Sequence, residues 1–195
     1  MALMVKNVRC NFPQVFNVPV INGEEGKRGV KLLLDKKKDA AQIKAVQKAM
    51  KECADEKLKG KMPPSDKLCL RDGADLGRDE YDGYVVLSVS AKNQPPVFKE
   101  DGRPFERAEI EAIASGEEED PFYSGCRVNA LISVWGQDNK FGKRVNGSLE
   151  GIQFAGDDDR LDGGMSKSTV YEAFGASMPS GDAEEEDEDY ESAFA

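Results

Sequence analysis

Apolar and polar residues alternate in five stretches of the chain, and this period of two predicts half-buried β-strands. In residues 126–134 every second position is apolar or small, from Cys126 to Val134. The other four stretches span residues 4–12, 30–34, 84–92 and 145–154. In the last of these the apolar positions change parity after Gly151, which predicts a β-bulge. The first strand is expected to stop at Pro13.

Two helices are expected between these strands. Apolar residues recur at helical spacing between Asp39, a candidate N-cap, and Gly60, a candidate C-terminal stop. Lysines occupy the opposite face, so this helix should pack its apolar stripe on the sheet. The stripe lacks bulky aromatic side chains, which argues against binding to a membrane surface. A shorter helix is expected at residues 106–115, ending near Gly116.

The last two strands, in residues 122–154, are joined by a basic loop with an aromatic ring. Residues 136–143 carry Lys140, Phe141 and Lys143, and Arg144 follows directly. A hairpin tip with cations and an aromatic ring is suited to a nucleic acid, because the cations attract the phosphates and the ring can stack on a base. The alternative interpretation is a long polar hairpin in which Trp135 only caps the edge of the core.

The C-terminal segment has a different composition. It lacks apolar periodicity and ends in a run of carboxylates with no cation, so we expect it to be disordered. The chain therefore divides into a folded domain at residues 1–164 and a flexible acidic tail at residues 165–195. The residues of the tail that we expect to bind partners are its carboxylates and two rings: Asp182, Glu184, Glu185, Glu186, Asp187, Glu188, Asp189, Tyr190, Glu191 and Phe194.

The net charge of −10 conceals an uneven distribution. Residues 1–70 hold 15 Lys and Arg against 8 Asp and Glu, whereas the acidic residues gather in the later part of the chain. Proteins that bind nucleic acids draw much of their affinity from Lys and Arg at phosphates. Because the sign of the charge is regional, the acidic total does not exclude a nucleic-acid partner.

The residue types that serve most metal and hydrolytic sites are scarce. The chain has no histidine, and its four cysteines form no CxxC pair, so we expect reduced, buried thiols and no zinc knuckle. The acidic loop at residues 68–83 does not keep the spacing of a calcium loop. We therefore expect no metal, no cofactor and no enzymatic activity. The sequence shows no signal peptide and no membrane-spanning run, which predicts a soluble, intracellular protein.

Five strands with a helix among them and no βαβ repeat predict a mainly β protein with helices, built as an OB-fold-like five-stranded, partly open barrel. In that fold strands two and three and the loops joining strands one to two and four to five form an oligonucleotide groove. These loops fall at residues 13–28 and 136–143. We predict contacts to single-stranded DNA from aromatic and cationic residues on or beside this groove: Phe12, Phe16, Lys31, Arg71, Tyr84, Lys92, Tyr123, Arg127, Trp135, Lys140, Phe141, Lys143 and Arg144.

The acidic tail adds a regulatory hypothesis. A flexible polyanion tethered to a basic groove competes with DNA phosphates, because the tether sets a high effective concentration. When DNA fills the groove, the tail is released and its aromatic end becomes available to a partner protein.

Several segments carry a family resemblance: RCNFPQVF at residues 9–16, GVKLLLDKKKDAAQIKAVQKAM at 29–50, LCLRDG at 68–73, EYDGYVVLSVSAKNQPPVF at 80–98, YSGCRVNALISVW at 123–135, and GIQF with DGGMS at 151–166. In this order they resemble phage single-stranded DNA-binding proteins of a family formerly regarded as uncharacterised. The resemblance covers roughly residues 8–174. It implies an OB barrel that binds single-stranded DNA with little sequence preference in phage replication, recombination or repair.

The resemblance also implies partners and a location. Besides single-stranded DNA, we expect replication or recombination proteins to bind the tail in the cytoplasm of the infected bacterial host; a homodimer stays open. Two features depart from the pattern. The strong helix falls between strands two and three, whereas the standard OB helix lies between strands three and four. Ala195 follows Phe194, so docking through a terminal phenylalanine carboxylate is not carried over.

Two other classes of function stay open. A metal-dependent nuclease could use the carboxylates of Asp157, Asp158 and Asp159, since two-metal chemistry needs acidic side chains that converge. A protein-interaction or DNA-mimic module driven by the tail would bind a basic protein instead of DNA.

Overall fold

The computed structural model describes residues 2–18, 20–161 and 173–174. The chain separates into two units, Met1–Gly164 and Met165–Ala195. The acidic residues predicted to bind partners, Asp182 to Phe194, lie outside the described residues. The division into a DNA-binding domain and a flexible tail therefore stays a prediction.

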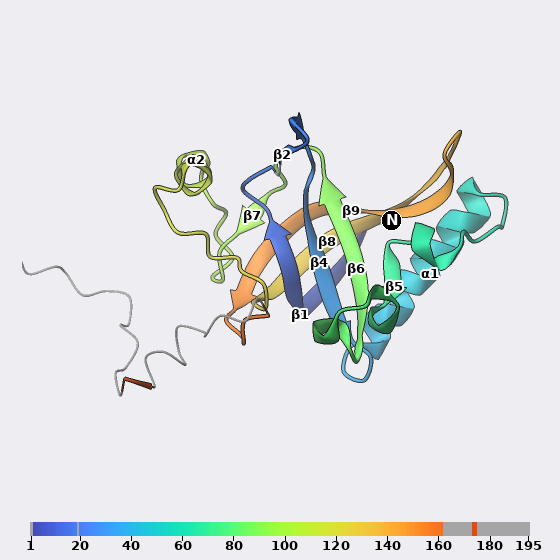
Figure 1. Cartoon of the computed structure of the whole chain (residues 1–195), viewed down its shortest axis with the longest axis horizontal. Coiled ribbons are helices and arrows are strands. Elements are labelled where there is room, and N and C mark those ends of the chain that lie inside the picture. Colours follow the sequence, from blue (N-terminus) through green and yellow to red (C-terminus); the bar gives the residue numbers. More distant parts are fainter. Residues whose placement is uncertain (1, 19, 162–172, 175–195) are drawn as a thin grey trace, which may run out of the picture. The chain divides into compact units, whose positions relative to one another are not determined.

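Five long strands close into a barrel (Figure 1). They are β1 (Ala2–Gln14), β4 (Arg28–Asp35), β6 (Tyr84–Ala91), β8 (Arg127–Asn139) and β9 (Gly142–Gly156). The strands β6, β4, β1, β8 and β9 pair in this order, each antiparallel to the next. A parallel pairing of β6 with β9 closes the ring, which was expected to be partly open. The predicted mainly β, OB-like five-stranded barrel is confirmed.

Shorter elements lie in segments where we expected loops. β5 (Leu70–Asp72) pairs with β6, and β7 (Val97–Phe98) pairs with β9. β2 (Val20–Ile21) and β3 (Glu24–Glu25) form a separate small hairpin. The 3-10 turns η1 (Ser65–Lys67), η2 (Gly73–Leu76) and η3 (Asp79–Tyr81) complete the connection between the first helix and β6. Elements of two to four residues are too short for periodicity to detect.

Both predicted helices are present and lie on opposite sides of the barrel (Figure 1). α1 (Ala40–Lys57) buries Ile43, Val46 and Met50 on its apolar face and packs against β8. Asp39 precedes it as predicted, but its carboxylate accepts hydrogen bonds from Asp35 N and Gln42 Nε2 instead of capping the helix. α2 (Arg107–Ser115) begins with a capping box at Glu106. Neither helix in the described part of the chain has the length and apolar character needed to cross a membrane.

Among the register shifts of the barrel strands, one in β9 and one in β1 bear on the sequence predictions. Leu131 pairs with Gly151 while Ile132 pairs with Leu149, so Glu150 is the extra residue of a bulge, as the parity change predicted. The expected end of the first strand at Pro13 is wrong, because β1 runs on to Gln14. It does so through a break in register after Asn11, where Phe12 takes a left-handed φ of 49°.

The core fills the barrel interior and includes Phe16. That ring is 1% exposed and packs against Phe105 and Phe122, with centroids 5.4 and 5.8 Å away. The prediction that Phe16 stacks on DNA bases is therefore wrong, because burial removes both faces of the ring from any ligand. All four cysteines are free and buried, as expected.

Candidate nucleic-acid interface

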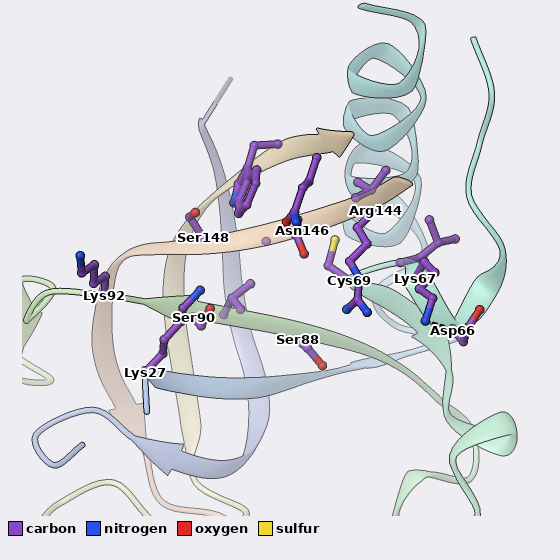
Figure 2. Close-up of a pocket in the computed structure, with 16 residues that line it drawn as sticks. Lys27, Asp66, Lys67, Cys69, Ser88, Ser90, Lys92, Arg144, Asn146 and Ser148 are labelled. Carbon is purple, nitrogen blue, oxygen red and sulfur yellow. Dashed lines mark hydrogen bonds and ion pairs between the residues drawn. The ribbon is translucent and has the colours of Figure 1, made fainter. Parts of the chain in front are cut away.

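A groove of about 440 Å³ lies on the barrel surface where β6 meets β9; we call it the β6–β9 groove (Figure 2). Small polar side chains, Ser88, Ser90 and Ser148, line it from the two strands. Ser90 and Ser148 are partners in the parallel pairing that closes the barrel. Because these side chains are short, a ligand backbone can approach the sheet closely there.

The charged residues that line the groove are mainly cations. Figure 2 shows Lys27 and Lys92 toward one end and Arg144 and Lys67 toward the other. Asp66 is the one carboxylate among the lining residues, and it is paired with Lys67 at 3.0 Å. The groove therefore carries a net positive charge although the chain as a whole is acidic. A polyanion is the ligand that this charge favours.

Trp135 lies at the edge of this groove. It pairs with Asn146 across the β8–β9 ladder, and both side chains line the groove. The indole is 42% exposed, and its other side borders a crevice with Cys53 and Lys57 of α1. Trp135 therefore lies between the groove and α1 and stays partly open. A half-exposed ring beside cations is suited to stacking on a base.

The tip of the β8–β9 hairpin presents a second ring. Phe141 is 71% exposed, and Lys140 Nζ lies 5.0 Å from its ring centroid. The hairpin projects beside α1 (Figure 1). Lys143, predicted to pair with phosphate, donates from Nζ to Leu58 O at 2.8 Å and lies 3.5 Å from Asp138. Its ammonium braces the hairpin against the end of α1.

Phe12, Lys31, Arg71 and Arg78 form a further aromatic and cationic group, which we call the Phe12 cluster. Phe12 is 44% exposed, with Lys31 Nζ 5.3 Å and Arg78 Cζ 4.9 Å from its ring centroid. Burial lowers the pKa of Lys31 below its ordinary value, and the charges of Arg78 and Arg71 lower it further. Sequence reasoning missed Arg78, which lies in an acidic loop and carries no periodic signal.

Three other predicted contacts lie away from the β6–β9 groove. The Tyr123 hydroxyl donates to Asp157 Oδ1 at 2.9 Å and accepts from Asp158 N at 3.0 Å. Burial and then the Asp157 carboxylate raise the pKa of Tyr123 to about 12. Arg127 Nε donates to Asp158 Oδ2 at 2.7 Å. Tyr84 lines a separate small pocket with Arg127. Tyr123 and Arg127 thus hold residues 157–159 against the barrel.

The acidic triplet of the nuclease hypothesis is engaged by these same side chains. Arg9 and Arg127 both pair with Asp158, at 3.8 and 2.7 Å. Burial raises the pKa of Asp158, but the Asp159 N–H and the two arginines outweigh it and lower the pKa below its ordinary value. Across residues 2–161, leaving aside Pro19, no three His, Cys, Asp or Glu side chains are grouped to hold a metal ion.

The structure thus brings Lys92, Trp135 and Arg144 of the predicted contacts into one groove. It adds Lys27, which lies on the predicted groove loop at residues 13–28, and five residues that the sequence analysis did not select: Lys67, Ser88, Ser90, Asn146 and Ser148. Strand parity could have found Ser88 and Ser90, since both fall on the outward positions of β6. Lys67 lies in a short 3-10 turn, and nothing in its local sequence places it beside β9.

Comparisons with known proteins point to one group. The family described as "Enterobacter phage Enc34, ssDNA-binding protein" matches residues 1–191. Protein p50 of Acyrthosiphon pisum secondary endosymbiont phage 1 is 31% identical over 181 residues, which are 84% of this chain and 88% of that protein.

Solved structures agree. A C-terminal truncation of the single-stranded DNA-binding protein from bacteriophage Enc34 is similar with a TM-score of 0.71 and 26% identity, over 82% of this chain and 88% of that one. The same phage's protein in complex with single-stranded DNA gives a TM-score of 0.70 and 26% identity, over 82% and 89%. The gp2.5 protein of bacteriophage T7 shares the fold, with a TM-score of 0.52 and 12% identity over 85% and 98%.

Proposed function

The chain belongs to the family of the Enterobacter phage Enc34 single-stranded DNA-binding protein, and we propose that it binds single-stranded DNA without catalysing a reaction. The family resemblance drawn from the sequence is thereby confirmed. The observation that carries the proposal is the β6–β9 groove, where four cations and Trp135 line a surface of small polar side chains. We assign this groove the central part of the binding site.

The chemistry of the groove favours single strands of any sequence. Lys27, Lys92 and Arg144 can pair with phosphates, an interaction that ignores base identity and weakens as salt rises. Trp135 can stack on any base, because every base has a π face, and each stacked base contributes about 1–3 kcal/mol. Bases must be unpaired to reach the ring, so duplex DNA should bind less well.

We infer the biological setting from the phage origin of the relatives. A sequence-tolerant binder of single strands protects and organises the DNA exposed during phage replication, recombination or repair, in the cytoplasm of the infected host. All the residues that line the groove come from one chain, and a homodimer stays open.

The acidic tail regulates access to this groove in our proposal. Residues 182–191 hold eight carboxylates and no cation, and the groove that they would occupy is cationic. Tethering keeps the local concentration of these carboxylates high, so they compete with DNA phosphates. DNA that displaces the tail frees Tyr190 and Phe194 to bind replication or recombination proteins.

Fluorescence anisotropy of a labelled oligo-dT tests both parts together. It is titrated with the full chain and with a chain ending at Met178, each at a low and a high salt concentration. We expect both chains to bind, more weakly at high salt, and the shortened chain to bind more tightly. If neither binds at low salt, DNA binding is overturned and a tail-driven interaction module is the better account.

A parallel incubation addresses the nuclease hypothesis. Labelled single strands are kept with the protein and magnesium or manganese and then analysed for length. We expect intact strands that are retained by the protein. Cleavage that disappears in an Asp157→Asn, Asp159→Asn double variant would overturn the non-enzymatic assignment.

A further inference from the structure

The Phe12 cluster lies outside the β6–β9 groove but borders it. Lys31 of β4 is the register partner of Ser88 of β6, and Ser88 lines the groove. Arg71 of β5 lies two residues after Cys69, which also lines the groove. A strand of DNA that leaves the groove across β6 therefore reaches the cluster at once.

The backbone of β1 holds Phe12 outward in an uncommon conformation. Its φ of 49° lies in the left-handed region, which is rare for a residue with a bulky side chain. Neighbours fix this geometry: the Phe12 N–H donates to Asn11 Oδ1 at 2.9 Å and Ser124 Oγ at 3.1 Å. Asn11 is itself 2% exposed, and its Nδ2 donates to Tyr81 OH at 3.1 Å. The ring is thus held at the surface by a buried network.

The charges around Phe12 are mainly positive, with Glu80 beside Arg78 and Asp66 within electrostatic reach of Arg71. Lys31, Arg71 and Arg78 gather there, and Arg78 is paired with Glu80 at 3.0 Å. The Arg71 Nε is buried and has no hydrogen-bond partner among the described residues. Like charges held close together repel, and an anion placed among them would relieve that repulsion. Phosphate fits, since arginine presents N–H groups in a fork that matches phosphate oxygens.

Resting on the proposed DNA-binding function, we propose that the Phe12 cluster is a second nucleotide subsite. A base displaces the cations from the Phe12 ring and stacks there, and Lys31, Arg71 and Arg78 turn to the flanking phosphates. Both changes favour DNA binding. The stacked base replaces a solvent-exposed cation–π contact at Phe12, and each cation that leaves the ring pairs with a phosphate.

Two subsites predict that affinity depends on oligonucleotide length. An oligo-dT just long enough for the β6–β9 groove does not reach Phe12, whereas a longer one occupies both. Oligo-dT of increasing length, from about 4 to about 16 nucleotides, covers the range found for single OB folds. Each length is titrated against the full-length wild type and against Phe12→Leu, Phe12→Tyr, Arg78→Gln and Trp135→Ala.

We expect Phe12→Leu to weaken the longer oligonucleotides about tenfold and to leave the shortest one unchanged. Phe12→Tyr keeps an aromatic face and should bind like the wild type. Arg78→Gln should reduce the slope of log affinity against log salt by about 0.7 for the longer oligonucleotides, the value for one phosphate contact on a single strand. Trp135→Ala should weaken every length, because Trp135 lines the groove itself.

Two variants serve as matched controls. Met4→Ala removes a side chain on β1 that is 50% exposed, and Arg107→Gln removes an α2 charge that is 92% exposed. Both should bind every length like the wild type, and thermal unfolding should show that all the chains are folded.

The possible results separate the two proposals. If Phe12→Leu and Arg78→Gln bind all lengths with unchanged affinity and salt slope while Trp135→Ala weakens them, the subsite is wrong and the groove stands. An equal loss in Phe12→Tyr and Phe12→Leu would also overturn stacking at Phe12. If the wild type binds no oligonucleotide, the proposed function itself is overturned, and the subsite with it.

Discussion

Trp135 of β8 lies directly opposite Asn146 of β9, and both side chains line the β6–β9 groove. Trp135 is also the single tryptophan of the chain, so tryptophan fluorescence reports on the surroundings of this one side chain. We predict that saturating oligo-dT quenches the emission, because a stacked base excludes water from the indole and contacts its π face. The midpoint of the quenching should match that of anisotropy. Unchanged emission at saturation would place the DNA elsewhere.

Removing the rings of the hairpin should weaken binding. We predict that Trp135→Ala costs about 1–3 kcal/mol of binding free energy to oligo-dT, and that Phe141→Ala costs no more than this. Phe141 is 71% exposed and does not line the groove, so it contacts DNA only where a strand extends to the tip of the hairpin. Anisotropy titrations at fixed salt measure both effects.

Leu131→Ala is the control for these two substitutions, because Leu131 is an exposed residue of β8 that does not line the groove. It should bind like the wild type. If Trp135→Ala and Phe141→Ala both left the affinity unchanged, the assignment of the hairpin to DNA binding would be wrong.

The parallel contact that closes the barrel depends on Gly147. It is the partner of Val89, and a Cβ at this position would lie 2.9 Å from Val89 Cγ1 and 3.0 Å from Ser88 O. We predict that Gly147→Ala separates β6 from β9 and lowers the free energy of unfolding by about 1–3 kcal/mol, as overpacked cores do. Urea denaturation measures the change.

Gly151, in the same strand, offers a matched control. A Cβ there would meet only Pro96 O, at an ordinary 3.5 Å. Gly151→Ala should therefore unfold close to the wild type. Equal stability of the two variants would show that the β6–β9 contact tolerates a wider spacing than the one observed.

Much of the fold follows from local sequence. Strand parity predicts all five barrel strands and the bulge at Gly151, because a strand buried on one face repeats every two residues. The same rule cannot detect β5 or β7, which are two or three residues long. It also misplaces the end of β1, since a left-handed Phe12 lets the strand pass Pro13.

The candidate site is less predictable because long-range contacts decide it. Trp135 and Arg144 could be selected, since they lie on outward positions of a polar hairpin. The sequence could not show whether Phe16 is buried or exposed on its loop. The rings that bury it, Phe105 and Phe122, are about a hundred residues away along the chain. The sequence likewise gives no sign that Arg127 is paired, because its partner Asp158 is distant along the chain and only the fold brings the two side chains together.

The ion pairs of Asp158 with Arg127 and Arg9 should make the free energy of unfolding depend on pH. Asp158 receives a hydrogen bond from Arg127 and a second charge from Arg9, and its pKa lies below the ordinary value in the folded protein. A carboxylate with a lowered folded pKa stabilises the protein above its unfolded pKa, and this contribution is lost as the pH falls through the folded value. We predict that Asp158→Asn lowers the free energy of unfolding at neutral pH by about 1–2 kcal/mol.

The difference between Asp158→Asn and the wild type should be smaller at an acid pH below the folded pKa of Asp158 than at neutral pH, because the wild-type carboxylate is then protonated as well. Urea denaturation at both pH values measures it, with Asp75→Asn as a control at an exposed carboxylate. An Arg127→Gln, Asp158→Asn double variant should lose less than the sum of the single changes, because both remove the same ion pair. A loss that is equal at both pH values would mean that Asp158 acts through packing and not through its charge.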